Sequence, residues 1–64
     1  MKNYIIENLK NGNKIILVFN KEFRRVAIGL VDELPSDENS LVIKTNEFDA
    51  IVNLSTVKYA FIKN

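Results

Sequence analysis

The run "FRRVAIGLVDEL" (residues 23–34) carries the pattern that decides the fold. Apolar residues alternate along it, so that Val26, Ile28 and Leu30 fall on one side, as side chains do in a β-strand. The run is longer than most single strands. Gly29, near its middle, predicts a sharp bend or bulge, which lets one strand serve both halves of a curled sheet.

The preceding run, "KIILVFN" (residues 14–20), predicts a strand that is apolar on both faces. Hydrophobic residues fill every position from Ile15 to Phe19, which is typical of a strand that is covered on both sides. We predict that "NKEF" (residues 20–23) forms the hairpin loop between these two strands.

Turn residues and short apolar runs divide the rest of the chain. The expected elements are a turn at residues 35–39, strands at 40–45 and 50–54 around a turn at 46–49, a helical turn at 55–57, and a last strand at 58–63. Five short strands, one of them bent, predict a small closed barrel of the SH3-like or OB-like kind, because closure removes exposed edges. We therefore expect one mainly β domain, with the barrel over residues 14–63.

The N-terminal segment has two interpretations. We favour a helix over about residues 3–11, with Asn3 as its N-cap and Gly12 as the left-handed residue that ends it. Three apolar side chains would share one stripe of this helix: Ile5, Ile6 and Leu9. Alternatively, Asn11 and Gly12 form the tight turn of a β-hairpin, which would give a six-stranded meander.

Composition excludes several classes of protein. A chain of 64 residues without cysteine or histidine has no disulfide and no typical zinc site, so its stability depends on packing or on association with copies of itself. No apolar run has the length of a signal peptide or a membrane span, so we expect a cytoplasmic protein without a membrane partner.

The charges are segregated along the chain although the net charge is only +1. Residues 1–31 are mostly basic, residues 32–49 are mostly acidic, and the tail is basic again. Such segregation indicates a basic ligand face or head-to-tail contact between subunits. The alternative is that solvated loops simply carry the charge.

No catalytic constellation is present. The carboxylate pairs at residues 32–33 and 37–38 flank a Pro-Ser turn, where solvation explains them. The serines have no histidine to activate them, and the acids lack the spacing of a calcium loop. We therefore predict a protein that is not an enzyme and that has no cofactor and no metal.

Nucleic-acid binding has more support. Lys21, Arg24 and Arg25 cluster around one hairpin, and adjacent arginines on a strand point to opposite faces, so one of them is expected to face outward. Exposed aromatic rings would stack against bases, and the candidates are Tyr59, Phe48 and Phe23. The alternative is that these aromatics are core residues and that the arginines either extend their charged ends to solvent along an apolar surface or pair with Glu22 and Glu33.

Two stretches carry a resemblance to a known family. "VAIGLVDELPSDENSLVI" contains Gly29, Asp32 and Asn39 in order, and "AIVNLSTVKYAFI" has the outline of a strand, a short polar loop and a strand. Together with a short helix, a bent second strand and a one-turn link, the chain resembles the Sm-like family, which includes LSm proteins and Hfq-type RNA chaperones. The resemblance implies a five-stranded Sm-like barrel, a ring-forming oligomer and an RNA site in its loops.

These considerations give a hypothesis of a homo-oligomer, a ring or a dimer, that binds RNA or a nucleotide. The candidate ligand-binding residues, some carried over by loop position from the resemblance, are Asn20, Lys21, Arg24, Arg25, Asn39, Ser40, Asn53, Ser55, Thr56 and Lys58. Self-association would pair the last strands edge to edge and cover their second apolar face. The rival hypothesis is a protein-interaction module of the phage or plasmid accessory type, whose acidic loop at residues 32–38 docks a basic partner.

Overall fold

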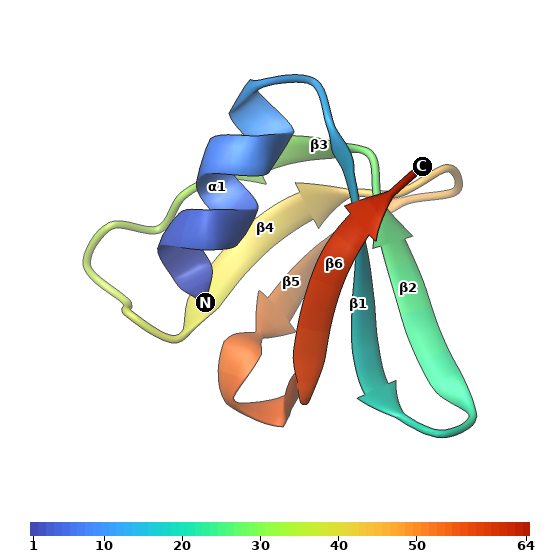
Figure 1. The fold of residues 1–64 in the computed structure, drawn as a ribbon. Helices are drawn as coiled ribbons and strands as arrows, with labels where there is room; N and C mark the ends of the chain where they lie inside the picture. Colours follow the sequence, from blue (N-terminus) through green and yellow to red (C-terminus); the bar gives the residue numbers. More distant parts are fainter.

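The computed structural model describes all residues from 1 to 64 and contains one α-helix and six β-strands (Figure 1). The elements in chain order are α1 (Lys2–Lys10), β1 (Lys14–Asn20), β2 (Phe23–Ala27), β3 (Gly29–Asp32), β4 (Ser40–Lys44), β5 (Asp49–Asn53), the single 3-10 turn η1 (Leu54–Thr56) and β6 (Tyr59–Lys63). The prediction of a mainly β protein with a short N-terminal helix is confirmed.

The strands form two antiparallel sheets of three strands each, in the orders β2–β1–β6 and β3–β4–β5. The run predicted as one long bent strand is in fact two strands, because the chain leaves strand geometry at Ile28. The backbone N–H of Ile28 donates to the carbonyl of Lys44 at 2.8 Å, so the second half of the run pairs with β4 instead of β1. The bend was therefore predicted at the right place.

β5 and β6 are the edge strands that are not joined by this bend. β5 pairs only with β4, and β6 pairs only with β1. No backbone pairing joins β5 to β6, so both sheets are open there and the expected closed five-stranded barrel is not confirmed.

The helical interpretation of the N-terminal segment is confirmed, and the hairpin alternative is wrong. The helix begins and ends one residue earlier than predicted. The prediction of Asn3 as N-cap is also wrong, because the cap is Met1 and no side chain bonds to it. Gly12 has a φ of +84°, as expected for the left-handed residue that ends a helix.

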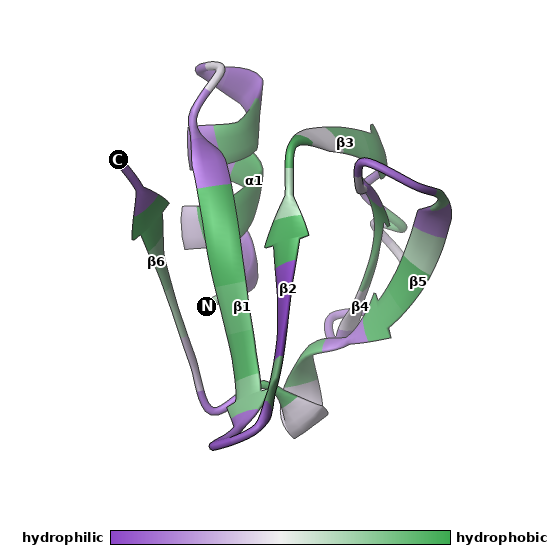
Figure 2. Cartoon of the chain, turned by 90° about the vertical axis from the view of Figure 1, so that its right-hand side faces the viewer, coloured by the Kyte–Doolittle hydropathy of each residue, from purple (hydrophilic) through white to green (hydrophobic).

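The hydrophobic core lies between the two sheets and under α1, which packs on β1 and β3. Its largest fully buried side chains are Ile5, Ile15, Leu17, Leu41 and Ile43. Figure 2 shows that β1 is hydrophobic along most of its length, as the central strand of its sheet. Both faces of β1 are in fact covered at Leu17 and Val18, which are adjacent and both buried.

Two connections differ slightly from their predictions. Only residues 21–22 lie outside the strands in the first hairpin, because β1 and β2 extend to Asn20 and Phe23. The single helical turn begins at Leu54, where the side chain of Asn53 accepts the N–H of Ser55 at 3.0 Å. Neither α1 nor this turn has the length and apolar composition needed to cross a bilayer.

Candidate functional site

Four of the predicted site residues lie together around a small hollow of about 140 Å³ on the β2–β1–β6 sheet. The residues that line it are Val18, Asn20, Lys21, Arg24, Lys58 and Tyr59. They come from three segments: the end of β1 with its hairpin loop, β2, and the start of β6. The hollow therefore forms only when the fold brings these separate segments together.

The strand register explains why these residues meet. Val18 on β1 pairs with Arg24 on one side and with Tyr59 on the other, so the three side chains share one face of the sheet. The N–H of Lys58 donates to the carbonyl of Val18 at 2.8 Å, which holds Lys58 beside the same strand. Val18 is only 4% exposed although it lies on the outward face, so it forms an apolar floor under the basic side chains.

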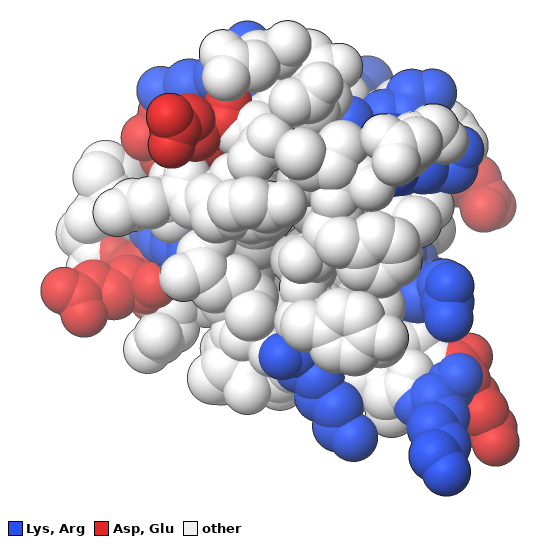
Figure 3. Space-filling model, in the orientation of Figure 1, with Lys and Arg blue, Asp and Glu red and all other residues white.

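The cations of the hollow have no carboxylate partner. The structure contains two ion pairs, Lys10–Glu33 and Lys44–Asp49, and neither includes a residue of the hollow. The alternative that the arginines pair with Glu22 and Glu33 is therefore wrong. Figure 3 shows lysine and arginine side chains along the right and lower border of an uncharged surface over which β6 runs, with acidic side chains beside some of them at the right edge. These charges are available to an anionic ligand.

Arg25 points away from this face, as the alternation of strand residues predicts for neighbouring arginines. It pairs with Leu17, which is fully buried on the inner side of the sheet. Its guanidinium lies 4.3 Å from the centre of the Phe23 ring and donates to the carbonyl of Arg24 at 3.1 Å. Arg25 thus lies on the opposite face of the sheet from Arg24, although both arginines also border a hollow of about 360 Å³ that contains Glu47.

The surface on which Arg25 lies is an apolar groove of about 430 Å³ that reaches from β1 and β2 to β5 and η1. Its apolar lining includes Phe19, Phe23, Phe48, Ile51 and Val52, and its polar lining includes Arg25, Asn53 and Thr56. Two of these rings contact each other, since the centroids of Phe19 and Phe23 are 5.1 Å apart. The groove flanks the strand β5, which is open at one edge.

The predicted loop residues form a third group, at the far end of the β3–β4–β5 sheet. Ser40 pairs with Asn53, and the carbonyl of Asn39 accepts the N–H of Leu54 at 2.6 Å. Their polar atoms are used locally: the Ser55 hydroxyl donates to the Asn53 side chain at 2.7 Å. The Thr56 hydroxyl donates to the Asn53 carbonyl, also at 2.7 Å. These bonds stabilise η1 and do not extend to the basic hollow.

The three aromatic side chains considered as base-stacking candidates are too exposed to be core residues. Tyr59 is 53% exposed, Phe48 is 51% exposed and Phe23 is 40% exposed, so the interpretation as core residues is wrong for all three. The sequence prediction also missed Phe61, whose ring stacks with that of Tyr59 at a centroid distance of 5.9 Å. Strand alternation could have found it, because Phe61 follows Tyr59 by two residues.

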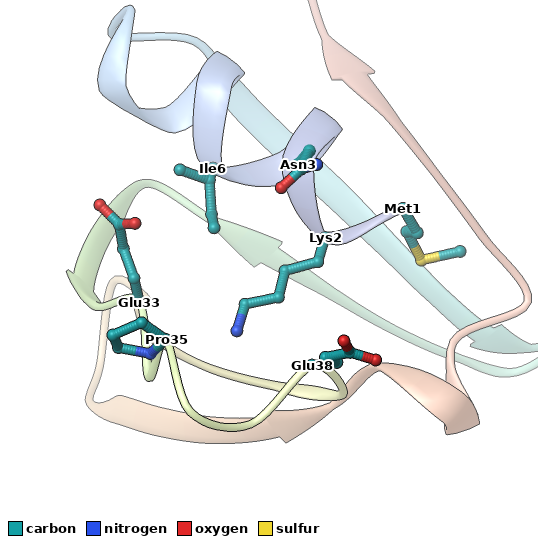
Figure 4. Close-up of a pocket in the computed structure, with 7 residues that line it drawn as sticks. All are labelled: Met1, Lys2, Asn3, Ile6, Glu33, Pro35 and Glu38. Atoms are coloured by element: carbon teal, nitrogen blue, oxygen red, sulfur yellow. The ribbon is translucent and has the colours of Figure 1, made fainter.

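The acidic loop lies against α1 and encloses a hollow of about 500 Å³ (Figure 4). Lys2 extends from the helix across this hollow, and its ammonium donates to the carbonyls of Leu34 at 2.9 Å and Asp37 at 2.6 Å. The ion pair of Lys10 with Glu33 adds a second link between helix and loop. The acidic and basic segments of the chain therefore meet within one molecule.

Asp37 is the one titratable group whose pKa clearly departs from its ordinary value. The backbone N–H of Asn39 donates to its carboxylate at 2.9 Å, and this bond is the main cause that lowers the pKa of Asp37. A hydrogen bond from Ser40 and the nearby charge of Lys2 lower the pKa further. This carboxylate therefore stabilises the loop in its ionised form.

Comparison of the chain with protein-family models, with characterised proteins and with solved structures gives no match.

Proposed function

We propose that this protein is a non-enzymatic, self-associating, Sm-like protein that binds RNA or a nucleotide. The observation that supports this most strongly is the convergence of Lys21, Arg24 and Lys58 around one hollow, where none of them forms an ion pair. A cluster of free cations on one face is the electrostatic footprint expected of a surface that binds phosphates.

The hollow offers each kind of contact that a nucleotide uses. The guanidinium of Arg24 can hold two phosphate oxygens at once, and the ammonium groups of Lys21 and Lys58 add charge without fixed direction. The ring of Tyr59 borders the same hollow and has an exposed surface against which a base can stack. These contacts involve the phosphate and the flat face of the base, which all nucleotides have, so they do not select one base over another.

The order of elements supports the Sm-like part of the proposal. A short helix precedes the strands, the chain bends at Ile28, and one turn of 3-10 helix separates the last two strands. These are the features on which the sequence resemblance rests. Closure of the two open sheets into a barrel would complete the arrangement.

Self-association is supported by the two open strand edges. Ile51 on β5 is 75% exposed, the highest value among the large hydrophobic side chains. If β5 paired in antiparallel fashion with β6 of a second copy, Ile51 could lie opposite Phe61 while Asp49 lay opposite Lys63. This register covers an exposed apolar residue, joins opposite charges and protects both edges.

RNA binding is tested by titrating a fluorescently labelled oligoribonucleotide with protein and recording anisotropy between about 50 and 200 mM salt. We expect affinity to fall with salt, and the double variant Arg24→Gln, Lys58→Gln to lower the slope of log K against log salt by about 1.4. The double variant Lys10→Gln, Lys44→Gln is the matched control, because it removes the same charge from the two existing ion pairs. Equal binding by both variants would contradict the proposed site.

The oligomer is tested by light-scattering mass at two protein concentrations. We expect a mass above that of one chain, and we expect Ile51→Lys to shift the population to single chains, because a charge at that position opposes edge pairing. Ile51 is mostly exposed, so the variant keeps the fold of the single chain, which circular dichroism verifies. A single-chain mass for the wild type at both concentrations would remove self-association from the proposal.

The rival hypothesis of an acidic docking loop has less support. Lys2 already donates hydrogen bonds to two carbonyl oxygens of that loop, and Lys10 forms an ion pair with Glu33. The loop is thus engaged by the protein's own helix, whereas the basic hollow has no internal partner.

A further inference from the structure

Alternate positions and direct cross-strand pairs put eight side chains on the outward face of the β2–β1–β6 sheet. They are Arg24 and Val26 on β2, Lys14, Ile16 and Val18 on β1, and Tyr59, Phe61 and Lys63 on β6. None of the three strands contains an aspartate or glutamate. The face is therefore apolar and aromatic in its middle and positive at its ends.

Two aromatic rings dominate the β6 part of this face. Tyr59 and Phe61 are separated by two residues, or about 6.6 Å of strand. Their ring centroids are 5.9 Å apart, and their planes differ by 22°. Both rings remain accessible, at 53% and 38% exposure, because β6 is an edge strand. They form a short row of rings beside the apolar floor of β1.

Cations lie beyond both ends of this row. Arg24, Lys21 and Lys58 surround the hollow at the Tyr59 end. Lys14 and Lys63 are cross-strand neighbours at the opposite end of the face. Lys63 lies about 13 Å along β6 from Tyr59. A ligand that matches the face must present flat rings in its middle and negative charge on both sides. Single-stranded nucleic acid has both features accessible, whereas a duplex hides the faces of its bases in its own stack.

We infer that this face binds a short single-stranded nucleic-acid segment, with bases stacked against Tyr59 and Phe61 and phosphates held by the cations at both ends. The inference rests on the proposed function and adds to it the form of the ligand and a wider binding surface. The ligand would use the face of β6, which leaves the free edge of that strand for pairing. In the register proposed above for a second copy, Asp49 would pair with Lys63, and Lys14 would then hold the phosphate at that end.

The first test compares the variants Tyr59→Leu and Phe61→Leu with the wild type in binding to labelled oligouridylate and to oligodeoxyuridylate. Each variant is expected to weaken binding about tenfold, which is the scale of one lost base–ring contact. Phe23→Leu is the matched control, since it removes a ring of 40% exposure whose position on β2 alternates with Arg24 and which lines the apolar groove instead of this face. Urea unfolding verifies the fold of each variant, and Tyr59→Leu alone suffices if Phe61→Leu is unstable.

Different outcomes would contradict the single-strand inference and the proposed function. If the wild type binds neither oligonucleotide, the inference is overturned, and if it binds no mononucleotide either, the proposed function is overturned with it. Binding that depends on Arg24 and Lys58 but is unchanged by both leucine variants would overturn the inference alone. Equally tight binding of a duplex, or of a polyglutamate peptide that carries charge without bases, would also overturn it. Preference for oligouridylate over oligodeoxyuridylate, which lacks only the 2′-hydroxyl, identifies RNA as the source of the strand.

A second measurement uses the absence of tryptophan. The chain contains two tyrosines, so in a Tyr4→Phe background all tyrosine fluorescence comes from Tyr59. Tyr4 lies on α1 and not on any of the three strands that form the proposed face. Oligouridylate should quench this fluorescence in parallel with the anisotropy change, because a stacked base lies against the ring. Saturation of binding without quenching would show that Tyr59 does not touch the bases.

Discussion

The ammonium group of Lys2 donates a hydrogen bond of 2.9 Å to the carbonyl oxygen of Leu34, which ties the first turn of α1 to the loop between β3 and β4. Leu34 has a φ of +48°, a left-handed conformation that residues with a side chain rarely adopt. The side chain of Asp32 accepts the N–H of Leu34 at 3.0 Å. This strained residue is therefore held at both of its backbone polar groups.

Loss of this bond should loosen the helix from the loop. Lys2→Met keeps most of the side chain but removes the ammonium, so we expect a loss of about 1 kcal/mol in the free energy of unfolding, measured with urea. Lys44→Met is the control, because the Lys44 side chain is 61% exposed and its partner is 3.9 Å away. An exposed pair contributes about 0–1 kcal/mol, and one with a separation as long as 3.9 Å falls at the lower end of that range. Equal stabilities of the two variants would show that the Lys2 bonds contribute little.

The two glycines should respond differently to alanine. Gly12→Ala forces a side chain into a φ of +84°, and we expect it to cost roughly 1–2 kcal/mol of stability. At Gly29 an added Cβ would meet the Cβ of Lys44 at 3.7 Å, an ordinary contact, so Gly29→Ala should leave stability within about 0.5 kcal/mol of the wild type. Thermal melts of both variants test this, and a larger loss at Gly29 would contradict the assigned backbone.

The helix should be essential to the core. Ile5 is fully buried, and Ile5→Ala should cost about 2–5 kcal/mol, enough to unfold much of so small a domain. Ile5→Val should cost only about 0.5–1.5 kcal/mol. Tyr4→Ala, at a neighbouring position that is 43% exposed, is the control for loss of a large side chain from the same helix. Similar circular dichroism and melting for Ile5→Ala and Tyr4→Ala would contradict the packing of α1.

Acid should weaken the loop through Asp37. Its carboxylate has a lowered pKa in the folded protein, chiefly because of the Asn39 N–H, so the unfolded chain takes up its proton first as pH falls. The stability that it contributes is complete above the ordinary aspartate pKa of 3.8 and is lost as pH falls through the lower folded value.

Asp37→Asn should therefore be less stable than the wild type at neutral pH, and the two should converge in strongly acidic solution. Urea unfolding at pH values from about 5 downward measures this. Glu38→Gln removes the neighbouring exposed carboxylate and is the control. A gap between Asp37→Asn and the wild type that stays constant with pH would exclude titration as its cause.

Local patterns were sufficient to predict much of the fold. Gly12 and Gly29 marked the end of the helix and the bend next to Ile28, because each needs only local backbone geometry. The start of the helix was harder to predict. Asn3 has the chemistry of a cap, but Lys2 is already held in the first turn by a loop that is distant in sequence. Such a tertiary contact leaves no local signal.

The candidate site was likewise predictable only where local sequence determines it. Alternation separated Arg24 from Arg25, but it could not decide which of them faces outward, because β1 is apolar on both faces and gives no preferred inner side. Lys58 joins the hollow only through the register of β6 on β1, which is a pairing between distant parts of the chain. The convergence of the cations therefore had to be seen in three dimensions.

The pairing of Lys14 with Lys63 joins β1 to β6 across most of the length of the chain. Closing so long a loop is slow, so the two local hairpins should assemble early and β6 should dock late in folding. Unfolding should then begin by release of β6, and any ligand that spans β6 and its neighbours would have to leave first. Occupancy of that face would thus lengthen the lifetime of the native state, a kinetic effect in addition to its effect at equilibrium.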